Sequence, residues 1–150
     1  MRPGTIASAV GKGLFAGFAG TLAMTAGQAA EMSLRHRQPS AAPAEAAGKA
    51  LGVTPTGEEE KQRFSQLVHF GYGTGWGAIR GLIGAAGIQG IPAAALHFAA
   101  VFGAGLVILP ALKVAPPVPE WGTEEIVIDA LHHAVYAAAT HVAYEALDRD

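Results

Sequence analysis

The side chains that could carry chemistry are six histidines, three tyrosines and Arg80, an arginine within an apolar stretch. If residues 69–87 form a helix, His69, Tyr72 and Arg80 share one face, because residues three, four, seven and eleven apart stack on a helix. The other faces of this stretch carry mostly Gly, Ala, Ile and Leu. A face of imidazole, phenol and guanidinium groups could hold a ligand, move protons or bond neighbouring helices together.

A second polar stripe is predicted near the C-terminus, in residues 124–147. Its polar positions fall within a third of the helix circumference: Glu125, Asp129, His132, His133, Tyr136, Thr140 and Tyr144. The opposite positions are apolar: Val127, Ile128, Leu131, Ala134, Val135, Ala138 and Val142. We therefore expect the polar set to face a protein interior or water, and the apolar set to face lipid or a packed neighbour.

A His-x-x-Tyr motif connects the two stripes. It occurs three times, at His69/Tyr72, His133/Tyr136 and His141/Tyr144. The first two copies lie at matching places in the two halves of the chain. This repeat predicts two similar helical hairpins.

The composition favours helices that pack closely in lipid. Of the 150 residues, 51% are hydrophobic and only 15% are charged, whereas soluble domains carry roughly 25% charged residues. The 20 glycines suit membrane helices, whose interfaces are rich in small residues. A net charge of −2 without a basic stripe argues against nucleic acid as a partner. With no cysteine, disulfides and thiolate sites are excluded.

These features predict an all-α fold, a four-helix transmembrane bundle in a single domain. The expected spans are residues 6–32, 64–88, 92–112 and 124–147, with a polar connection over 35–63 that contains a short helix at 44–51. The span at 92–112 has the clearest length and hydrophobicity. The alternatives are a signal peptide in place of the first span, and a soluble helical bundle with an Ala/Gly-rich core.

Local patterns predict how the helices begin and how they pack. Thr56 to Glu59 is typical of a capping box, and Thr123 is expected to cap the last helix. Thr21 and Thr25 are expected to bond back to carbonyls of their own helix. Small residues predict close helix contacts: Gly13, Ala16, Gly17 and Gly20 in the first span and Gly73, Gly77, Gly81 and Gly84 in the second.

The basic residues predict an orientation. The first and third loops contain Arg35, Arg37, Lys49, Lys61, Arg63 and Lys113, and the other side has Arg2, Lys12 and Arg149. By the positive-inside rule, both termini should lie outside. We expect a multi-pass protein of a bacterial inner (plasma) membrane, with the lipid bilayer as its main partner.

Folding the four spans into an antiparallel bundle brings polar residues together inside it. The predicted interior cluster consists of Gln28, His69, Tyr72, Arg80, His97, Asp129, His133 and Tyr136. Within it, Arg80 is expected to hold an anion or a carboxylate such as Asp129. Ionisable groups inside a membrane span usually face the interior and are candidate functional sites.

Three functions fit such an interior. The favoured one is structural: interhelical hydrogen bonds hold the bundle together, and the protein acts as a homo-oligomer or as an assembly partner of another membrane protein. The second is proton-linked or small-solute transport or pH sensing, because histidine changes charge between roughly pH 5 and 8. The third is a haem or divalent metal site, since Asp129 and His133 lie one helical turn apart. No enzymatic function is predicted, because no nucleophile elbow, P-loop or dinucleotide fingerprint occurs.

Several short motifs carry a resemblance to a known family. They are Gly17–Thr25 (GFAGTLAMT), His69–Gly73 (HFGYG), the Pro116–Pro117 loop and His133–Ala137 (HAVYA). Together they resemble the small bacterial inner-membrane proteins of the YagU type, a family of unknown function, over most of the chain outside the first loop. Ala137 stands where glycine is expected, and His132 and His141 are additional to the pattern. The resemblance implies a multi-pass inner-membrane protein and brings no catalytic residues.

Overall fold

The computed structural model describes residues 3–149 and is all-helical. The α-helices are α1 (Pro3–Arg35), α2 (Ala42–Leu51), α3 (Glu58–Ala85), α4 (Gly90–Ala111) and α5 (Thr123–Leu147), and a 3-10 turn, η1, covers Val118–Glu120. No strand occurs among these described residues. The predicted all-α class and the short helix in the polar connection are therefore confirmed.

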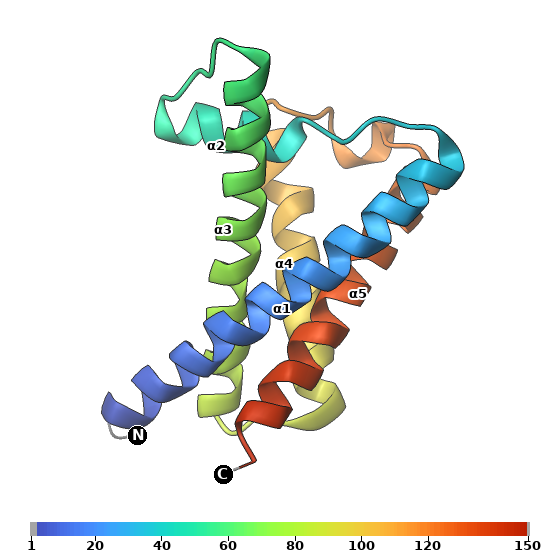
Figure 1. The fold of residues 1–150 in the computed structure, drawn as a ribbon. Helices are drawn as coiled ribbons and strands as arrows, with labels where there is room; N and C mark the ends of the chain where they lie inside the picture. The colour runs from blue at the N-terminus through green and yellow to red at the C-terminus, as the bar shows by residue number, and fades with distance from the viewer. Residues whose placement is uncertain (1–2, 150) are drawn as a thin grey trace.

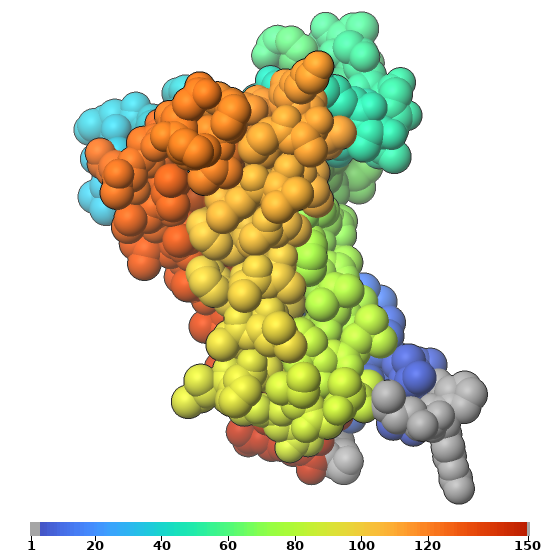
Figure 2. Space-filling view, turned by 180° about the vertical axis from the view of Figure 1, so that it is seen from behind, coloured from blue at the N-terminus to red at the C-terminus, as the bar shows by residue number. Residues whose placement is uncertain are grey.

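The arrangement places α1 across the other long helices. Figure 1 shows α1 running obliquely over α3 and α5, with α4 behind them. The start of α1 and the end of α5 lie at one end of the molecule, and α2 lies at the opposite end. Seen from behind, α4 forms the outer surface between α3 and α5 (Figure 2). We call the two ends the termini end and the α2 end.

Glycines let α1 pack against α3 almost backbone to backbone. A Cβ added to Gly17 would lie 2.7 Å from the Gly77 Cα and 2.9 Å from the Gly73 carbonyl oxygen. A Cβ on Gly77 would meet the Gly13 carbonyl and lie 2.6 Å from the Gly17 Cα. On the adjoining face of α1, Gly20 packs against Tyr136 and Thr140 of α5. The predicted close contacts of these two glycine rows are confirmed.

The helix starts differ from the predicted caps. The residue before α3 is Gly57, and Glu60, rather than Glu59, accepts hydrogen bonds from the backbone and hydroxyl of Thr56 at 3.2 Å each. These bonds hold the pKa of the Glu60 carboxyl below its usual value. Gly122, rather than Thr123, precedes α5, and its N–H donates to the Glu125 carboxylate at 3.4 Å. In both places the helix begins one residue away from the predicted position.

The predicted span limits also need correction. Helix α3, which contains most of the predicted span 64–88, ends at Ala85, three residues before the predicted limit. Gly87 has a positive φ of 86°, a left-handed conformation that ends the helix, and Gly90 begins α4. Only α1, from Gly4, and α4 are both long enough and apolar enough to cross a membrane by composition. The described helices thus include two candidate spans by length and composition, and the predicted four-span arrangement stays a prediction.

The interior of the bundle is polar and its exterior is apolar. The largest fully buried side chains are Arg80, Tyr136, His97, Thr21 and Thr140. Large apolar side chains instead point outward from every long helix: Phe15 is 76% exposed, Leu67 71%, Val107 68% and Leu131 60%. Most of the predicted apolar face of α5 is exposed, while His132, Tyr136, Thr140 and Tyr144 are buried. A fold in water normally shows the opposite distribution.

Candidate functional site

The polar interior begins near the α2 end with a bond between α1 and α3. Thr25 donates to the Thr21 carbonyl at 2.7 Å, and its Oγ1 lies 2.9 Å from His69 Nε2. Thr21 in turn donates to the Gly17 carbonyl at 2.8 Å. The predicted back-bonding of both threonines is confirmed, and His69 adds a bond across the helix interface.

The middle of the bundle joins α3, α4 and α5. The Tyr136 hydroxyl donates to the Gly73 carbonyl at 2.6 Å, and His97 Nε2 donates to the Trp76 carbonyl at 3.0 Å. The His97 and Tyr136 rings are 5.5 Å apart between centroids. Both acceptors are main-chain carbonyls of α3. They are accessible to neighbouring helices because residues 73 and 77 are glycines without side chains.

Arg80 forms the centre of the polar interior toward the termini end. Its side chain is fully buried, and its Nη2 donates to Glu145 Oε1 at 2.7 Å and to His141 Nδ1 at 3.1 Å. The guanidinium carbon lies 4.3 Å from the centre of the Tyr144 ring, within cation–π distance. The predicted pairing of Arg80 with Asp129 is wrong. Arg80 binds Glu145 instead, and Asp129 lies 16 residues earlier on α5, about 24 Å away at 1.5 Å per residue.

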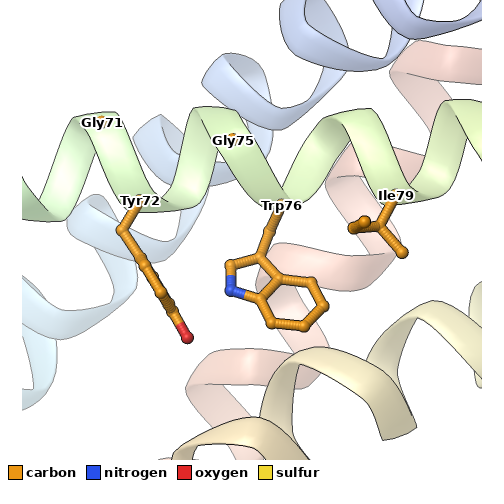
Figure 3. Close-up of a pocket in the computed structure, with 5 residues that line it drawn as sticks. All are labelled: Gly71, Tyr72, Gly75, Trp76 and Ile79. Atoms are coloured by element: carbon orange, nitrogen blue, oxygen red, sulfur yellow. The ribbon is translucent and has the colours of Figure 1, made fainter.

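The predicted cluster is therefore divided along the bundle axis. Asp129 pairs with His133 one turn later, with 3.3 Å between Oδ1 and Nδ1. Gln28 is partly buried and makes no hydrogen bond among the described residues. Tyr72 does not lie in the interior: its side chain points away from α1 beside Trp76 and is 48% exposed (Figure 3). Because Tyr136 is buried and Tyr72 is not, the two His-x-x-Tyr copies have different environments.

Sequence reasoning missed these pairings: Thr25 was not predicted as the partner of His69, nor His141 and Glu145 as the partners of Arg80. A signal for the last two was present. Every fourth residue of the last helix forms one row, Asp129, His133, Ala137, His141 and Glu145. Its last member, Glu145, lies one residue beyond Tyr144, the last residue of the predicted stripe.

Charged groups at the α2 end connect α1 to α5. Arg35 pairs with Glu124 at 2.7 Å, and Arg37 pairs with Glu31 at 2.6 Å. The bonded Glu31 carboxylate raises the pKa of Arg37 above its usual value. Lys49 of α2 donates to the carbonyls of Leu112 and Lys113 at 3.2 and 2.9 Å, which binds the end of α4. These exposed pairs order the helix ends rather than form a reaction centre.

The arrangement offers interhelical hydrogen bonds, not a set of metal ligands. Within residues 3–149, no group of three or more His, Asp or Glu side chains is placed to hold a metal ion. The hollow beside Tyr72 and Trp76 is shallow and lined by Gly71, Gly75 and Ile79. The haem or metal alternative stays a prediction without a supporting contact.

The two tyrosines of the repeat allow a matched prediction. Tyr136→Phe removes the hydroxyl that donates to Gly73 and should lower the free energy of unfolding in detergent by about 1 kcal/mol. Tyr72→Phe removes a hydroxyl without a protein partner and should change it by less than about 0.5 kcal/mol. Denaturant titration followed by tryptophan fluorescence measures both. Equal losses for the two variants would contradict the assigned role of Tyr136.

Comparison of the chain with protein-family models, with curated proteins and with solved structures found no match. The resemblance to the YagU type therefore stays a prediction.

Proposed function

We propose that this chain is an integral membrane protein of the bacterial plasma membrane, a non-enzymatic helical component in which α1, α3, α4 and α5 all cross the bilayer. One observation carries the proposal: the largest fully buried side chains are polar, while many large apolar side chains point outward. In water, such a surface would be a severe aggregation liability. In lipid, it is the favourable arrangement, because polar groups must find partners inside the bundle.

The polarity of α3 and α5 fits crossing as well. Neither is apolar enough to count as a span by composition, but the exposed charges Glu58–Arg63 and Glu124 lie near the helix starts, and Arg80 and Tyr136, within the helices, are fully or almost fully buried. Helices of 28 and 25 residues are about 42 and 38 Å long, more than the roughly 30 Å of a hydrocarbon core. Composition alone therefore underestimates these helices as spans.

Basic residues support an orientation for the proposed bundle. The α2 end has Arg35, Arg37, Lys49, Lys61, Arg63 and Lys113, while the termini end has Lys12 and Arg149, and Arg2 lies outside the described residues. This asymmetry favours a cytoplasmic α2 end and external termini.

Single cysteines test four spans against two, because the natural chain has none. With four spans, Ser40→Cys and Gln89→Cys lie on opposite sides of the membrane and react with an impermeant maleimide from opposite sides. With α1 and α4 as the only spans, both positions lie on the same side. Labelling of both cysteines from one side of sealed vesicles would therefore exclude the four-span arrangement.

The same proposal includes pairing with a second copy through the outer face of α3. An exposed row runs along this face at every fourth residue, Glu59, Arg63, Leu67, Gly71 and Gly75. A Cβ at either glycine would meet nothing within 4 Å, so another helix can approach as closely as α1 does on the opposite side. Glu59 and Arg63 pair with each other within the chain, and a two-fold axis along the row would bring the same pair of the second copy alongside, so that each charge has an opposite one nearby.

Disulfide cross-linking checks this pairing. Gly75→Cys should give a cross-linked dimer under mild oxidation in membranes, because the two-fold axis brings the two copies of residue 75 together. Gly103→Cys, on an open face of α4, is the matched control and should stay monomeric. Failure of Gly75→Cys to cross-link, or equal cross-linking of both, would contradict pairing through α3.

A proton-linked or solute pathway is the second candidate function, favoured by the succession of polar groups through the bundle. His69 lies toward the α2 end, His97 and Tyr136 in the middle, and Arg80 with Glu145 toward the termini end. Proteoliposomes with an internal pH dye would report proton entry after acidification. A rate that equals that of empty liposomes would exclude a proton pathway.

A further inference from the structure

The Arg80 guanidinium is buried with most of its donors unused. Of its five N–H groups, the two on Nη2 bond to Glu145 and His141, while Nε and both N–H groups of Nη1 have no partner within residues 3–149. The side chain is nevertheless fully buried. Buried arginine donors are costly without acceptors, so this edge of the guanidinium requires a partner from outside the protein.

Two further polar atoms without partners lie at the same level of the bundle. His97 donates through Nε2 to the Trp76 carbonyl, so in the neutral ring Nδ1 is an acceptor, and this atom is buried and unbonded. Thr140 Oγ1, which with Tyr136 adjoins Gly20 of α1, is buried and is also without a hydrogen-bond partner among the described residues. Trp76 lies one turn before Arg80, and Thr140 adjoins His141, which contacts Arg80. The unpartnered atoms of α3, α4 and α5 therefore belong to residues that lie within about one helical turn of Arg80 or of its partner His141.

A hollow at the termini end is lined in part by Tyr144, the residue whose ring contacts Arg80. It has a volume of about 490 Å³ and lies between the start of α1, the end of α3 and the end of α5. Ser8, Lys12 and Asp148 line its polar wall, and Tyr144 lines its inner side. Arg80 lies directly behind the Tyr144 ring.

We propose that water molecules enter through this hollow and bind between Arg80, His97 and Thr140. Water can accept hydrogen bonds from the unused Arg80 donors and donate one to His97 Nδ1. A group that only donates or only accepts could not satisfy both residues. A neutral molecule fits better than an anion, because the Glu145 carboxylate already balances the Arg80 charge. The proposal concerns the polar interior itself and depends on neither the four-span arrangement nor pairing between copies.

Water-edited solid-state NMR on the wild-type chain in lipid bilayers tests the bound water. The Arg80 Nε–H signal is assigned by correlation spectra and checked by its loss in Arg80→Lys. We expect the rate of polarisation transfer from water to the Arg80 Nε–H to lie within about threefold of the rate for the exposed Arg63 side chain. A rate that equals that of the backbone amide of Ala93, which is fully buried, would overturn the proposal.

A second measurement tests the route. Ser8→Phe fills the hollow, whereas Ala7→Phe places the same ring on an exposed residue outside the hollow. Deuterium exchange of the Arg80 side chain should slow at least fivefold in Ser8→Phe and stay unchanged in Ala7→Phe. Unchanged exchange in both variants would overturn entry through the hollow, and slowing in both would overturn the assignment of Ser8 to the route.

Discussion

Gly77→Val should prevent this chain from folding into its native bundle. A Cβ at residue 77 meets the Gly13 carbonyl and lies 2.6 Å from the Gly17 Cα, so it contacts main chain that cannot rotate away. Helices α1 and α3 must then separate, which disrupts the His69–Thr25 bond and exposes polar atoms to lipid. We expect a cost of more than about 3 kcal/mol, at the upper end for overpacked cores. Gel filtration in detergent should show no monodisperse protein.

The matched control for Gly77→Val lies on the same helix. Gly75 has nothing within 4 Å of its added Cβ, so Gly75→Val should fold with a free energy of unfolding within about 1 kcal/mol of wild type. The same variant should lose the proposed dimer, because it fills the outer face of α3. Equal folded yields for the two valine variants would show that α1 and α3 do not approach as described.

Glu145→Ala should give the second largest effect. It removes the carboxylate from Arg80 and leaves a fully buried charge without a counterion. Breaking a buried pair on one side costs about 3–5 kcal/mol. Because Glu145 is 39% exposed, we expect about 2–3 kcal/mol of lost stability in denaturant titration.

An exposed pair of the same length serves as the control for Glu145→Ala. Arg35 and Glu124 are also 2.7 Å apart, but the Glu124 side chain is 74% exposed. Glu124→Ala should cost less than about 1 kcal/mol, because solvent screens the pair. If Glu145→Ala and Glu124→Ala lower the free energy of unfolding equally, burial of Arg80 does not increase the contribution of Glu145 to stability.

The fold class and the faces of the helices could be predicted from the sequence because both depend on periodicity. The polar side of α5 and the glycine row of α3 repeat every three or four residues, and each faces inward. Helix limits were less predictable. The first residue of α3 depends on which residue precedes its first turn. The hydrogen bonds between Thr56 and Glu60 place Gly57 in that position.

The partners of the polar residues could not be predicted, because they depend on how far helices shift along one another. Arg80 was expected near Asp129, but the glycine contacts set a register in which it reaches Glu145. Tyr72 and Tyr136 have the same local motif, yet α3 turns Tyr72 outward because its glycines 73 and 77 face α1. A short motif contains no information on which face the neighbouring helix covers.

The most direct test of the account is extraction of the chain from cell membranes. We predict that it stays in the membrane pellet after washing with high salt and with alkaline carbonate, and that detergent releases it as a folded protein. Release by carbonate without detergent, as a monodisperse soluble species, would contradict a bundle with apolar side chains outside and Arg80, His97 and Tyr136 within.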